Sequence, residues 1–303
     1  MTRSNTMAIK HTPLPPHPTR PTPKYAEDEV HAIYKVSTPE PWTHNIWVEI
    51  EVHRGDQEGD LVLVMPAWTP GSYKIREFAK NVSHFQAFDA KDKELDWDLD
   101  DKQSWRIKAG SRKVVKVKYR LYAFELSVRT PHCDDTHCFF QPTNALMFIQ
   151  GQLETRSELI IEPFERWQVA CPLPTLHGRP NHFVADSYDI LADSPVEIGE
   201  HDIYSFEVSG KRHDIVIYGF GNHDPEQMVK DFRKIVLQNK RMWGDLPYEN
   251  YMFILQLLPK MRGGLEHLNS QVSQWDSYNF DTREGYEDFL SLISHEFFHL
   301  WNV

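Results

Sequence analysis

The sequence predicts a chain of mixed fold class, in which an all-β, sandwich-like domain is followed by the start of an α+β domain. Two observations lead to this prediction. From Tyr25 onward apolar side chains alternate with polar ones, as in strands that bury one face, and no helical period of useful length appears before about residue 222. Beyond that point, two stretches place apolar residues at helical spacing. We therefore expect a front domain at 25–215 and a second domain at 216–303.

The first 24 residues differ from the rest in composition. Six prolines stand between Pro13 and Pro23. Proline fixes its own backbone angle and lacks an N–H group, so a segment this rich in proline favours an extended chain over a helix or an interior strand. We expect residues 1–24 to form a disordered, proline-rich leader, and we assign it no function.

Strand patterns fill the front domain. In the clearest of them, Ile46, Val48, Ile50 and Val52 alternate with other residues, which predicts a half-buried strand. The uninterrupted apolar run 61–65 predicts a strand that is buried on both faces. Further strands are expected at 104–108, 115–121, 146–150, 157–161 and 167–170.

Helix signals mark the beginning of the second domain. Asp224-Pro-Glu-Gln227 offers a capping residue followed by proline at the first helical position, and the helix that it starts is expected to end near Gly244. A strand at 251–257, a glycine-containing turn at 262–264 and an edge strand around 270–275 are expected next.

A second helix is expected at the end of the chain. Asp281-Thr-Arg-Glu284 has the pattern of a capping box, which starts many helices. The residues that follow form an apolar stripe at helical spacing: Tyr286, Phe289, Leu290, Ile293, Phe297, Leu300 and Trp301.

The charge of the chain argues against some kinds of partner. The 303 residues carry 44 acidic and 33 basic side chains, a formal net charge of −11. Nucleic acids and anionic membrane surfaces attract clustered Lys and Arg, so we expect neither as a partner. No run of 18 apolar residues could span a bilayer, and the first residues lack the apolar segment of a secretory signal. We expect a cytoplasmic protein and leave its oligomeric state open.

The chain contains three cysteines, Cys133, Cys138 and Cys171. An odd number in a chain of this length does not indicate a disulfide framework. We favour free thiols. The alternative is that Cys133 and Cys138 hold a metal together with His132 and His137.

The segment His295-Glu-Phe-Phe-His299 lies within the last predicted helix. Two histidines four residues apart on a helix project from one face, with Cβ atoms about 5–6 Å apart, so both imidazoles can reach one metal ion. Glu296 would stand beside that metal, where its carboxylate can take a proton from water. We predict a zinc site with His295 and His299 as ligands and Glu296 as the general base. Two ordinary core histidines are the alternative.

Segments along the chain resemble a known family. Arg262-Gly-Gly-Leu-Glu-His267 resembles the Gly-x-Met-Glu-Asn strand of zinc aminopeptidases of the thermolysin-like (gluzincin) class. With the last helix, it looks like the glycyl aminopeptidase family whose longer members carry a C-terminal PDZ domain. Three segments of the front domain, 65–76, 128–140 and 185–199, are similar to that family as well. The resemblance extends from about residue 25 to the last residue.

The resemblance implies a β-rich front domain leading into a thermolysin-like catalytic domain, which binds one zinc ion and a peptide substrate. His295 and His299 match the family's ligands, Glu296 its base, and Glu266 the carboxylate that grips the substrate's free amino group. The family's third ligand, a glutamate on the following helix, would fall beyond Val303, as would any PDZ domain. We therefore expect this chain to be the N-terminal half of such an enzyme, with 216–303 as a truncated catalytic domain.

Two further segments offer candidates for binding the substrate. Gly263 and Gly264 precede Glu266, and we interpret them as part of the substrate-binding strand, although a plain hairpin would also explain them. The turn-rich segment 66–73 leads into the other candidates, Tyr73 and Arg76, for which a packing role is the alternative.

These residues together predict a zinc-dependent metallopeptidase. The preferred hypothesis is an aminopeptidase that removes small N-terminal residues, glycine or alanine, from peptides with water activated by zinc. One alternative is a zinc endopeptidase. The other is a catalytically incomplete protein whose β-domain binds peptides or partners and retains a two-ligand metal site.

Overall fold

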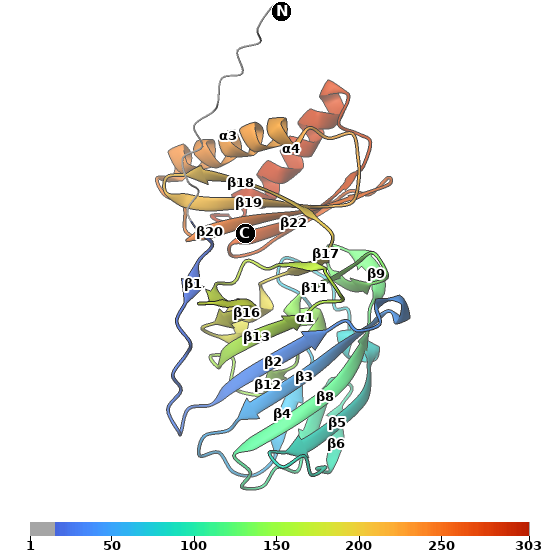
Figure 1. The fold of residues 1–303 in the computed structure, drawn as a ribbon, viewed down its shortest axis with the longest axis vertical. Helices are drawn as coiled ribbons and strands as arrows, with labels where there is room; N and C mark the ends of the chain where they lie inside the picture. The colour runs from blue at the N-terminus through green and yellow to red at the C-terminus, as the bar shows by residue number, and fades with distance from the viewer. Residues whose placement is uncertain (1–15, 303) are drawn as a thin grey trace, which may run out of the picture.

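The computed structural model describes residues 16–302, and strands dominate them (Figure 1). The largest sheet has eight strands in the order β1-β15-β16-β13-β2-β3-β8-β5. These strands are β1 (Thr19–Arg20), β15 (Thr175–Leu176), β16 (Arg179–Ala185), β13 (Arg156–Glu162), β2 (His31–Ser37), β3 (Asn45–His53), β8 (Val114–Tyr122) and β5 (Val82–Asp89). A four-stranded sheet packs against it and consists of β12 (Phe148–Ile149), β4 (Leu61–Val64), β7 (Ser104–Ile107) and β6 (Trp97–Asp101).

These two sheets form a sandwich around the main core. On β3, Ile46, Val48 and Ile50 are almost fully buried, whereas Trp47 and Glu49 between them are exposed. The buried residues lie opposite apolar residues of β8, and apolar side chains of β4 and β7 complete the same core. Period-two alternation therefore predicted the buried face correctly, and the predicted all-β, sandwich-like front domain is confirmed.

A third sheet lies between the sandwich and the second domain (Figure 1). We call it the middle sheet; it consists of β14 (Gln168–Ala170), β17 (Val196–Gly199), β11 (His137–Phe140), β10 (Thr130–Cys133) and β9 (Phe124–Ser127). Beyond it lies the fourth sheet, which we call the helix-covered sheet. Its strands are β18 (Asp202–Val208), β19 (Lys211–Tyr218), β20 (Asn250–Leu258), β22 (Ser270–Asp276) and β21 (Gly263–Glu266), in the order β18-β19-β20-β22-β21. All of β18 and most of β19 precede residue 216, so this part of the structure begins earlier in the chain than the second domain expected from the sequence.

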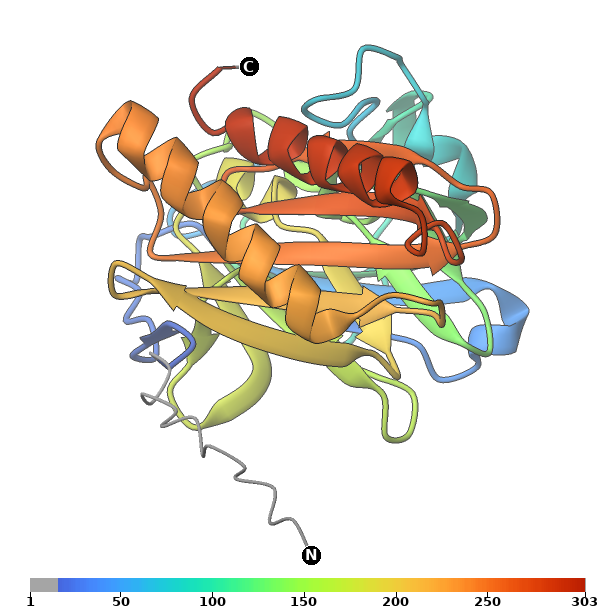
Figure 2. The same ribbon diagram turned by 90° about the horizontal axis from the view of Figure 1, so that it is seen from above.

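The helix-covered sheet has different neighbours on its two faces. Two helices, α3 (Pro225–Trp243) and α4 (Arg283–Phe298), lie over one face (Figure 2). Aromatic side chains fill the space beneath them, with Phe289 of α4 in contact with the rings of Phe232 and Trp275. Against the other face, Val128 and Phe139 of the front domain pack on residues of β19, β20, β21 and β22. The strand β20 pairs in parallel with both β19 and β22 and is buried along nearly its whole length.

The ends of both long helices follow local sequence signals. The side chain of Asp224 accepts a hydrogen bond from the backbone N–H of Gln227 at 3.1 Å, Pro225 occupies the first turn, and Gly244 follows the helix at φ +93°. The start of α4 is shifted by one residue from its prediction. Thr282, not Asp281, caps it, by accepting from the N–H of Gly285 at 3.1 Å. Both residue types cap helices well, so the sequence alone did not distinguish them.

The predicted turn and edge strand of the second domain are in other places. Residues 263 and 264 lie in β21 rather than in a turn, and the chain reverses before them, around Lys260 at φ +59°. Residues 270–275 belong to β22, which is an interior strand between β20 and β21. The prediction was wrong because glycine indicates either a turn or a close approach of other atoms to the backbone, and here the second applies.

One predicted strand of the front domain is shorter than expected, and four short helical elements were not predicted. The expected strand at 146–150 is reduced to β12 and follows a one-turn helix, α1 (Pro142–Ala145); a second short helix is α2 (Tyr188–Ala192). Two turns of 3₁₀-helix, η1 (Pro41–Thr43) and η2 (Phe78–Asn81), complete the elements. Helices of this length are too short to produce a readable period in the sequence.

The predicted disordered leader is wrong for its last part, and residues 1–15 lie outside the described residues. Thr19 and Arg20 form β1, which pairs in parallel with β15 at the edge of the eight-stranded sheet. Arg20 also forms an ion pair with Glu249 at 3.0 Å. Proline is compatible with such an edge because its missing N–H group need not face a neighbouring strand. Within residues 16–302, no helix has the length and apolar character needed to cross a membrane.

We predict that the aromatic cluster under the helices stabilises the second domain. Replacing Phe289, which is fully buried, by alanine should lower the free energy of unfolding by about 3–5 kcal/mol, because it leaves a cavity among α3, α4 and β22. The neighbouring Asp288 is exposed, so Asp288→Ala should change it by only about 0.5 kcal/mol. Urea denaturation of both variants measures this, and equal effects would contradict the packing described.

Candidate metal centre

The last helix brings the two predicted zinc ligands to one place. Phe289, Ile293 and Phe297 are four residues apart and fully buried, and they fix the face that α4 turns towards the helix-covered sheet. This face leaves His295 exposed and His299 half-buried on the side of the helix, while Glu296 is turned inward and is almost completely buried. The periodicity that packs the helix therefore also sets the direction of its polar residues.

The two imidazoles are close enough to share a metal ion. The Nε2 atoms of His295 and His299 lie 3.2 Å apart. Imidazole nitrogens approach this closely only when a proton or a cation lies between them, and two nitrogens bound to one tetrahedral zinc are separated by about 3.4 Å. The Nδ1 atom of His299 lies 2.8 Å from the carbonyl oxygen of Asn302, so that nitrogen can donate and leave Nε2 free to bind a metal. The donor set therefore fits zinc.

Glu296 lies against the edge strand of the sheet. A Cβ atom added to Gly264 of β21 would fall 1.9 Å from Oε1 of Glu296. No side chain larger than hydrogen fits there unless the helix or the carboxylate moves. Gly264 is therefore required for the position that the Glu296 carboxylate takes against β21, which explains why glycine stands within this strand.

The surroundings of Glu296 change its acidity. Burial, followed by the negative charge of Glu266, raises the pKa of the Glu296 carboxyl to about 7. The charges of His299 and Arg129 act in the opposite direction but do not cancel this effect. A carboxyl with a pKa near neutrality can both accept and release a proton at physiological pH, which is the property that a general base needs.

Glu266 lies at the end of β21 and contacts the front domain. Its carboxylate carbon and oxygens lie 2.9 Å from the position of a Cβ atom on Gly71, which has φ +75° in the loop between β4 and η2. A side chain at residue 71 would be strained by this backbone angle and would meet Glu266. The loop from the sandwich therefore approaches the carboxylate that the sequence predicted to bind an amino group.

Two residues that the sequence analysis did not single out hold β21 in place. Arg129, in the turn between β9 and β10, donates from Nη2 to the carbonyl oxygen of Gly264 at 3.0 Å. Asp193 lies 2.7 Å from Nδ1 of His267 and accepts from the N–H of Leu268 at 2.6 Å. Both residues lie within the segments 128–140 and 185–199 that resemble the aminopeptidase family, and that resemblance was the available signal. Their partners are 135 and 74 or 75 residues away in the sequence.

A cavity joins these residues of the two domains. It has a volume of about 260 Å³, and its lining includes Glu266 and His299 of the second domain together with Gly71 and Asp193 of the front domain. A larger hollow of about 440 Å³ lies around residues 20–25, away from these groups, so size alone does not identify the site. The smaller cavity is the one that connects His299 of the histidine pair with the carboxylate of the edge strand.

The remaining predicted residues lie beside this cavity or around it. Gly263 lies in β21, where its position is in ordinary contact with Val128. Tyr73 and Arg76 lie on the same loop as Gly71, but the described lining of the cavity includes neither. Tyr73 is 98% exposed, and Arg76 donates to Oγ of Ser72 at 3.3 Å. The structure thus brings together His295, Glu296, His299, Gly264 and Glu266, and leaves Tyr73 and Arg76 farther out.

Solved structures similar to this chain include several peptidases. An aminopeptidase N family protein from Idiomarina loihiensis is 29% identical, with a TM-score of 0.84 over 89% of this chain and 48% of that one. The M1 zinc metallopeptidase from Deinococcus radiodurans is 12% identical, with a TM-score of 0.53 over 90% of this chain and 64% of that one. A variant of it bound to a Tyr-Ser-Ala substrate is 13% identical, with a TM-score of 0.50 over 86% and 63%.

The two structures that are 12% and 13% identical to this chain show only that the folds are similar. This chain spans about half the length of the Idiomarina protein. No curated protein matches the chain. The front domain matches a known family. The Peptidase M61 N-terminal domain matches residues 33–200, which are more than half of the chain. The chain therefore belongs to the family of the Peptidase M61 N-terminal domain.

Proposed function

We propose that this protein is a zinc-dependent aminopeptidase that removes small N-terminal residues, glycine or alanine, from peptides. The observation that carries the proposal is the 3.2 Å separation of the Nε2 atoms of His295 and His299 on a helix that also presses Glu296 against the edge strand. We further propose that residues 216–303 are the N-terminal part of a thermolysin-like zinc peptidase domain of the glycyl aminopeptidase type, whose longer members carry a PDZ domain.

The comparisons support this proposal at a coarser level. The front domain belongs to a family named for a peptidase, and the similar solved structures are named as an aminopeptidase N family protein and as M1 zinc metallopeptidases. One of those metallopeptidases is described with a peptide substrate bound. Zinc, the preference for a free N-terminus and the choice of small residues are proposals for this chain.

The residues of this chain fit a zinc ion as two of its ligands. A catalytic zinc takes three protein ligands and keeps one position open, and the family resemblance implies a glutamate as the third ligand beside His295 and His299. When bound, zinc supplies a positive charge that polarises a peptide carbonyl group and makes a water molecule more acidic.

Glu296 is proposed to move the proton in this reaction. Its carboxylate adjoins the histidine pair, so it can accept a proton from water and then release it to the departing amine. Gly264 gives the carboxylate the space that it occupies, because a Cβ atom at residue 264 would fall 1.9 Å from Oε1 of Glu296. Arg129 of the front domain donates a hydrogen bond to the carbonyl oxygen of Gly264 and so helps to hold β21 in position.

Glu266 and β21 are proposed to bind the peptide. The strand lies at the edge of its sheet, so the backbone of a peptide can pair with it, and the Glu266 carboxylate can hold the peptide's α-ammonium group. Because Glu266 and His299 line the same cavity, the terminal peptide bond would be the one that reaches the histidines. The close approach of Gly71 to Glu266 limits the room at this end and favours a small first residue. Tyr73 and Arg76 remain candidates for contacts with the rest of the substrate.

The alternative is a catalytically incomplete protein that binds peptides at the same edge strand. It would use Glu266 and β21 in the same way but would not need Glu296 as a base. The two hypotheses therefore differ in what happens when Glu296 alone is changed.

We predict that Glu296→Gln reduces kcat about 10²–10⁴-fold in the protein that carries this sequence, because the amide cannot take a proton from water. Zinc content should be unchanged, since the histidines remain. The matched control is Glu284→Gln, an exposed residue in the first turn of the same helix, which should leave both properties unaltered. Peptide assays with metal analysis measure this; full activity in the Glu296 variant would remove it as the base.

We predict that the protein cleaves peptides with a free N-terminus and not the same peptides after N-acetylation, because acetylation removes the charge that Glu266 binds. Glu266→Gln should raise KM for free peptides roughly 10-fold or more, which corresponds to the loss of a hydrogen bond to a charged group. Cleavage rates for paired free and acetylated peptides measure both effects. Equal cleavage of the two forms would favour an endopeptidase instead.

A pH effect is expected in the metal-free chain. Because the pKa of Glu296 is raised in the folded state, its contribution to stability is greatest below its ordinary pKa of about 4.5 and is lost as the pH rises towards 7. Glu296→Gln should therefore be more stable than the unaltered chain at pH 8, with the difference shrinking towards pH 4.5. Urea denaturation in a chelating buffer at pH 5 and pH 8 measures this, and a difference that does not change with pH would show that Glu296 has an ordinary pKa.

A further inference from the structure

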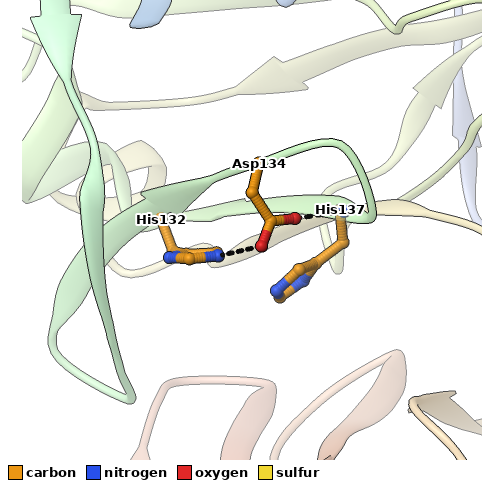
Figure 3. A group of neighbouring side chains, drawn as sticks. All are labelled: His132, Asp134 and His137. Carbon is orange, nitrogen blue, oxygen red and sulfur yellow. Dashed lines mark hydrogen bonds and ion pairs between the residues drawn. The ribbon is translucent and has the colours of Figure 1, made fainter. Parts of the chain in front are cut away.

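The hairpin formed by β10 and β11 carries a second group of possible metal ligands. His132, Asp134 and His137 each offer one atom to the group, and these atoms lie within 4.8 Å of one another. Figure 3 shows the three side chains gathered on one side of the hairpin. His132 and His137 are almost fully buried, at 6% and 0% exposure. The group lies in the front domain and shares no residue with the centre on α4.

The His137 ring is held by a chain of buried side chains. Its Nδ1 atom lies 2.7 Å from Oε1 of Glu197, a residue of β17 with no exposure. The other carboxylate oxygen accepts a hydrogen bond from Nε2 of Gln256 at 2.8 Å, and Gln274 donates in turn to Gln256 at 2.9 Å. A carboxylate at Nδ1 places the imidazole proton there, so Nε2 is left with a lone pair. This carboxylate–histidine arrangement is the one that supports metal-binding histidines.

The Nε2 atom of His137 is buried and has no hydrogen-bond partner among the described residues. A buried acceptor without a partner costs about 1–3 kcal/mol, so such atoms are uncommon. The ring is also fixed from the side, because Tyr218 of β19 stacks on it with a centroid distance of 3.6 Å. This atom is well positioned, buried and unpaired, and a cation between the three side chains would give it a partner.

Asp134 is oriented to offer one oxygen to the group. Its Oδ1 atom accepts hydrogen bonds from the backbone N–H groups of Thr136 at 2.8 Å and His137 at 3.2 Å, which fixes the carboxylate at the hairpin turn. The Oδ2 atom lies 3.1 Å from Nε2 of His132. That separation suits either a hydrogen bond or two ligands of one ion.

The cysteines of the hairpin do not belong to this group. Cys133 and Cys138 are free, fully buried and packed in the core of the sandwich. Each follows one of the two histidines directly, and successive residues of a strand point to opposite faces. The free thiols favoured from the sequence are confirmed, and the alternative of a site shared by both cysteines and both histidines is wrong.

We propose that His132, Asp134 and His137 bind a structural divalent cation of the zinc class, at a site separate from the centre on α4. Two imidazole nitrogens and one carboxylate oxygen form a donor set that zinc accepts. The site lies where the middle sheet meets the helix-covered sheet, because Glu197 of β17 contacts Gln256 of β20 and His137 contacts Tyr218 of β19. A cation bound here would join the two strands of the hairpin and fix the His137 ring, which Glu197 and Tyr218 contact at the boundary with the helix-covered sheet.

The test uses this chain with both histidines of the other centre replaced, His295→Ala together with His299→Ala. After dialysis against zinc-free buffer, the double variant should retain about one zinc per chain, and added zinc should raise its Tm. Adding Asp134→Asn to it should weaken zinc binding at least about tenfold. The asparagine keeps an oxygen for the two backbone N–H groups at the turn but presents an amide nitrogen, which cannot bind zinc, in place of Oδ2.

Two further variants make the result decisive. His132→Gln, added to the same double variant, should also remove the retained zinc and the shift in Tm. His182→Gln is the matched control, because His182 forms a buried pair with Glu158 at 2.6 Å without belonging to the group, and it should leave zinc binding unchanged. Failure of the double variant to retain zinc, or zinc that persists after both Asp134→Asn and His132→Gln, would overturn the proposal.

Discussion

The close approach of α4 to β21 is the contact on which the candidate site depends. At Gly264 the strand has no side chain, and the carboxylate of Glu296 occupies the space where a Cβ atom would be. The aromatic core beneath the helix holds the two elements at this separation. As a result, an acidic group that water would normally keep ionised is enclosed beside the histidine pair, and its pKa rises. The packing of α4 against β21 therefore also raises the pKa of Glu296.

The front domain contributes to the site as well as to the fold. Arg129 reaches the backbone of β21, Asp193 contacts both His267 and Leu268, and the loop carrying Gly71 closes over Glu266. These contacts arrive from three separate segments of the sandwich and the middle sheet. The edge strand is thus supported from the side that faces away from α4, which explains why a short strand of four residues is held in one position.

The sequence correctly predicted those features that depend on interactions between residues close together in the chain. The alternation of Ile46, Val48 and Ile50 predicted a strand and its buried face, and Asp224, Pro225 and Gly244 predicted the ends of α3, because each of these signals acts within a few residues. The four-residue spacing of His295 and His299 likewise predicted that their rings would meet.

Long-range contacts could not be predicted in this way. The local pattern of Gly263 and Gly264 predicted a turn, and only the family resemblance placed them in a strand, because the reason for Gly264, the side chain of Glu296, lies about thirty residues later in the chain. Arg129 and Asp193 were not singled out, since nothing in one sequence reveals that their partners are in β21 or directly after it. The interior place of β22 depends on parallel pairing with β20, which the pattern of β22 itself does not encode.

The shortness of β21 has a consequence for self-association. Strands at the edge of a sheet expose unpaired backbone groups and can join with the edge of another molecule. Here the strand has only four residues, and the carbonyl oxygen of Gly264 is already bound by Arg129. An edge of this length offers a second sheet too few hydrogen bonds to extend the pairing, yet it can still receive a few residues of extended chain. The same short length that limits aggregation would, under the proposed function, restrict what the edge binds to the end of a peptide.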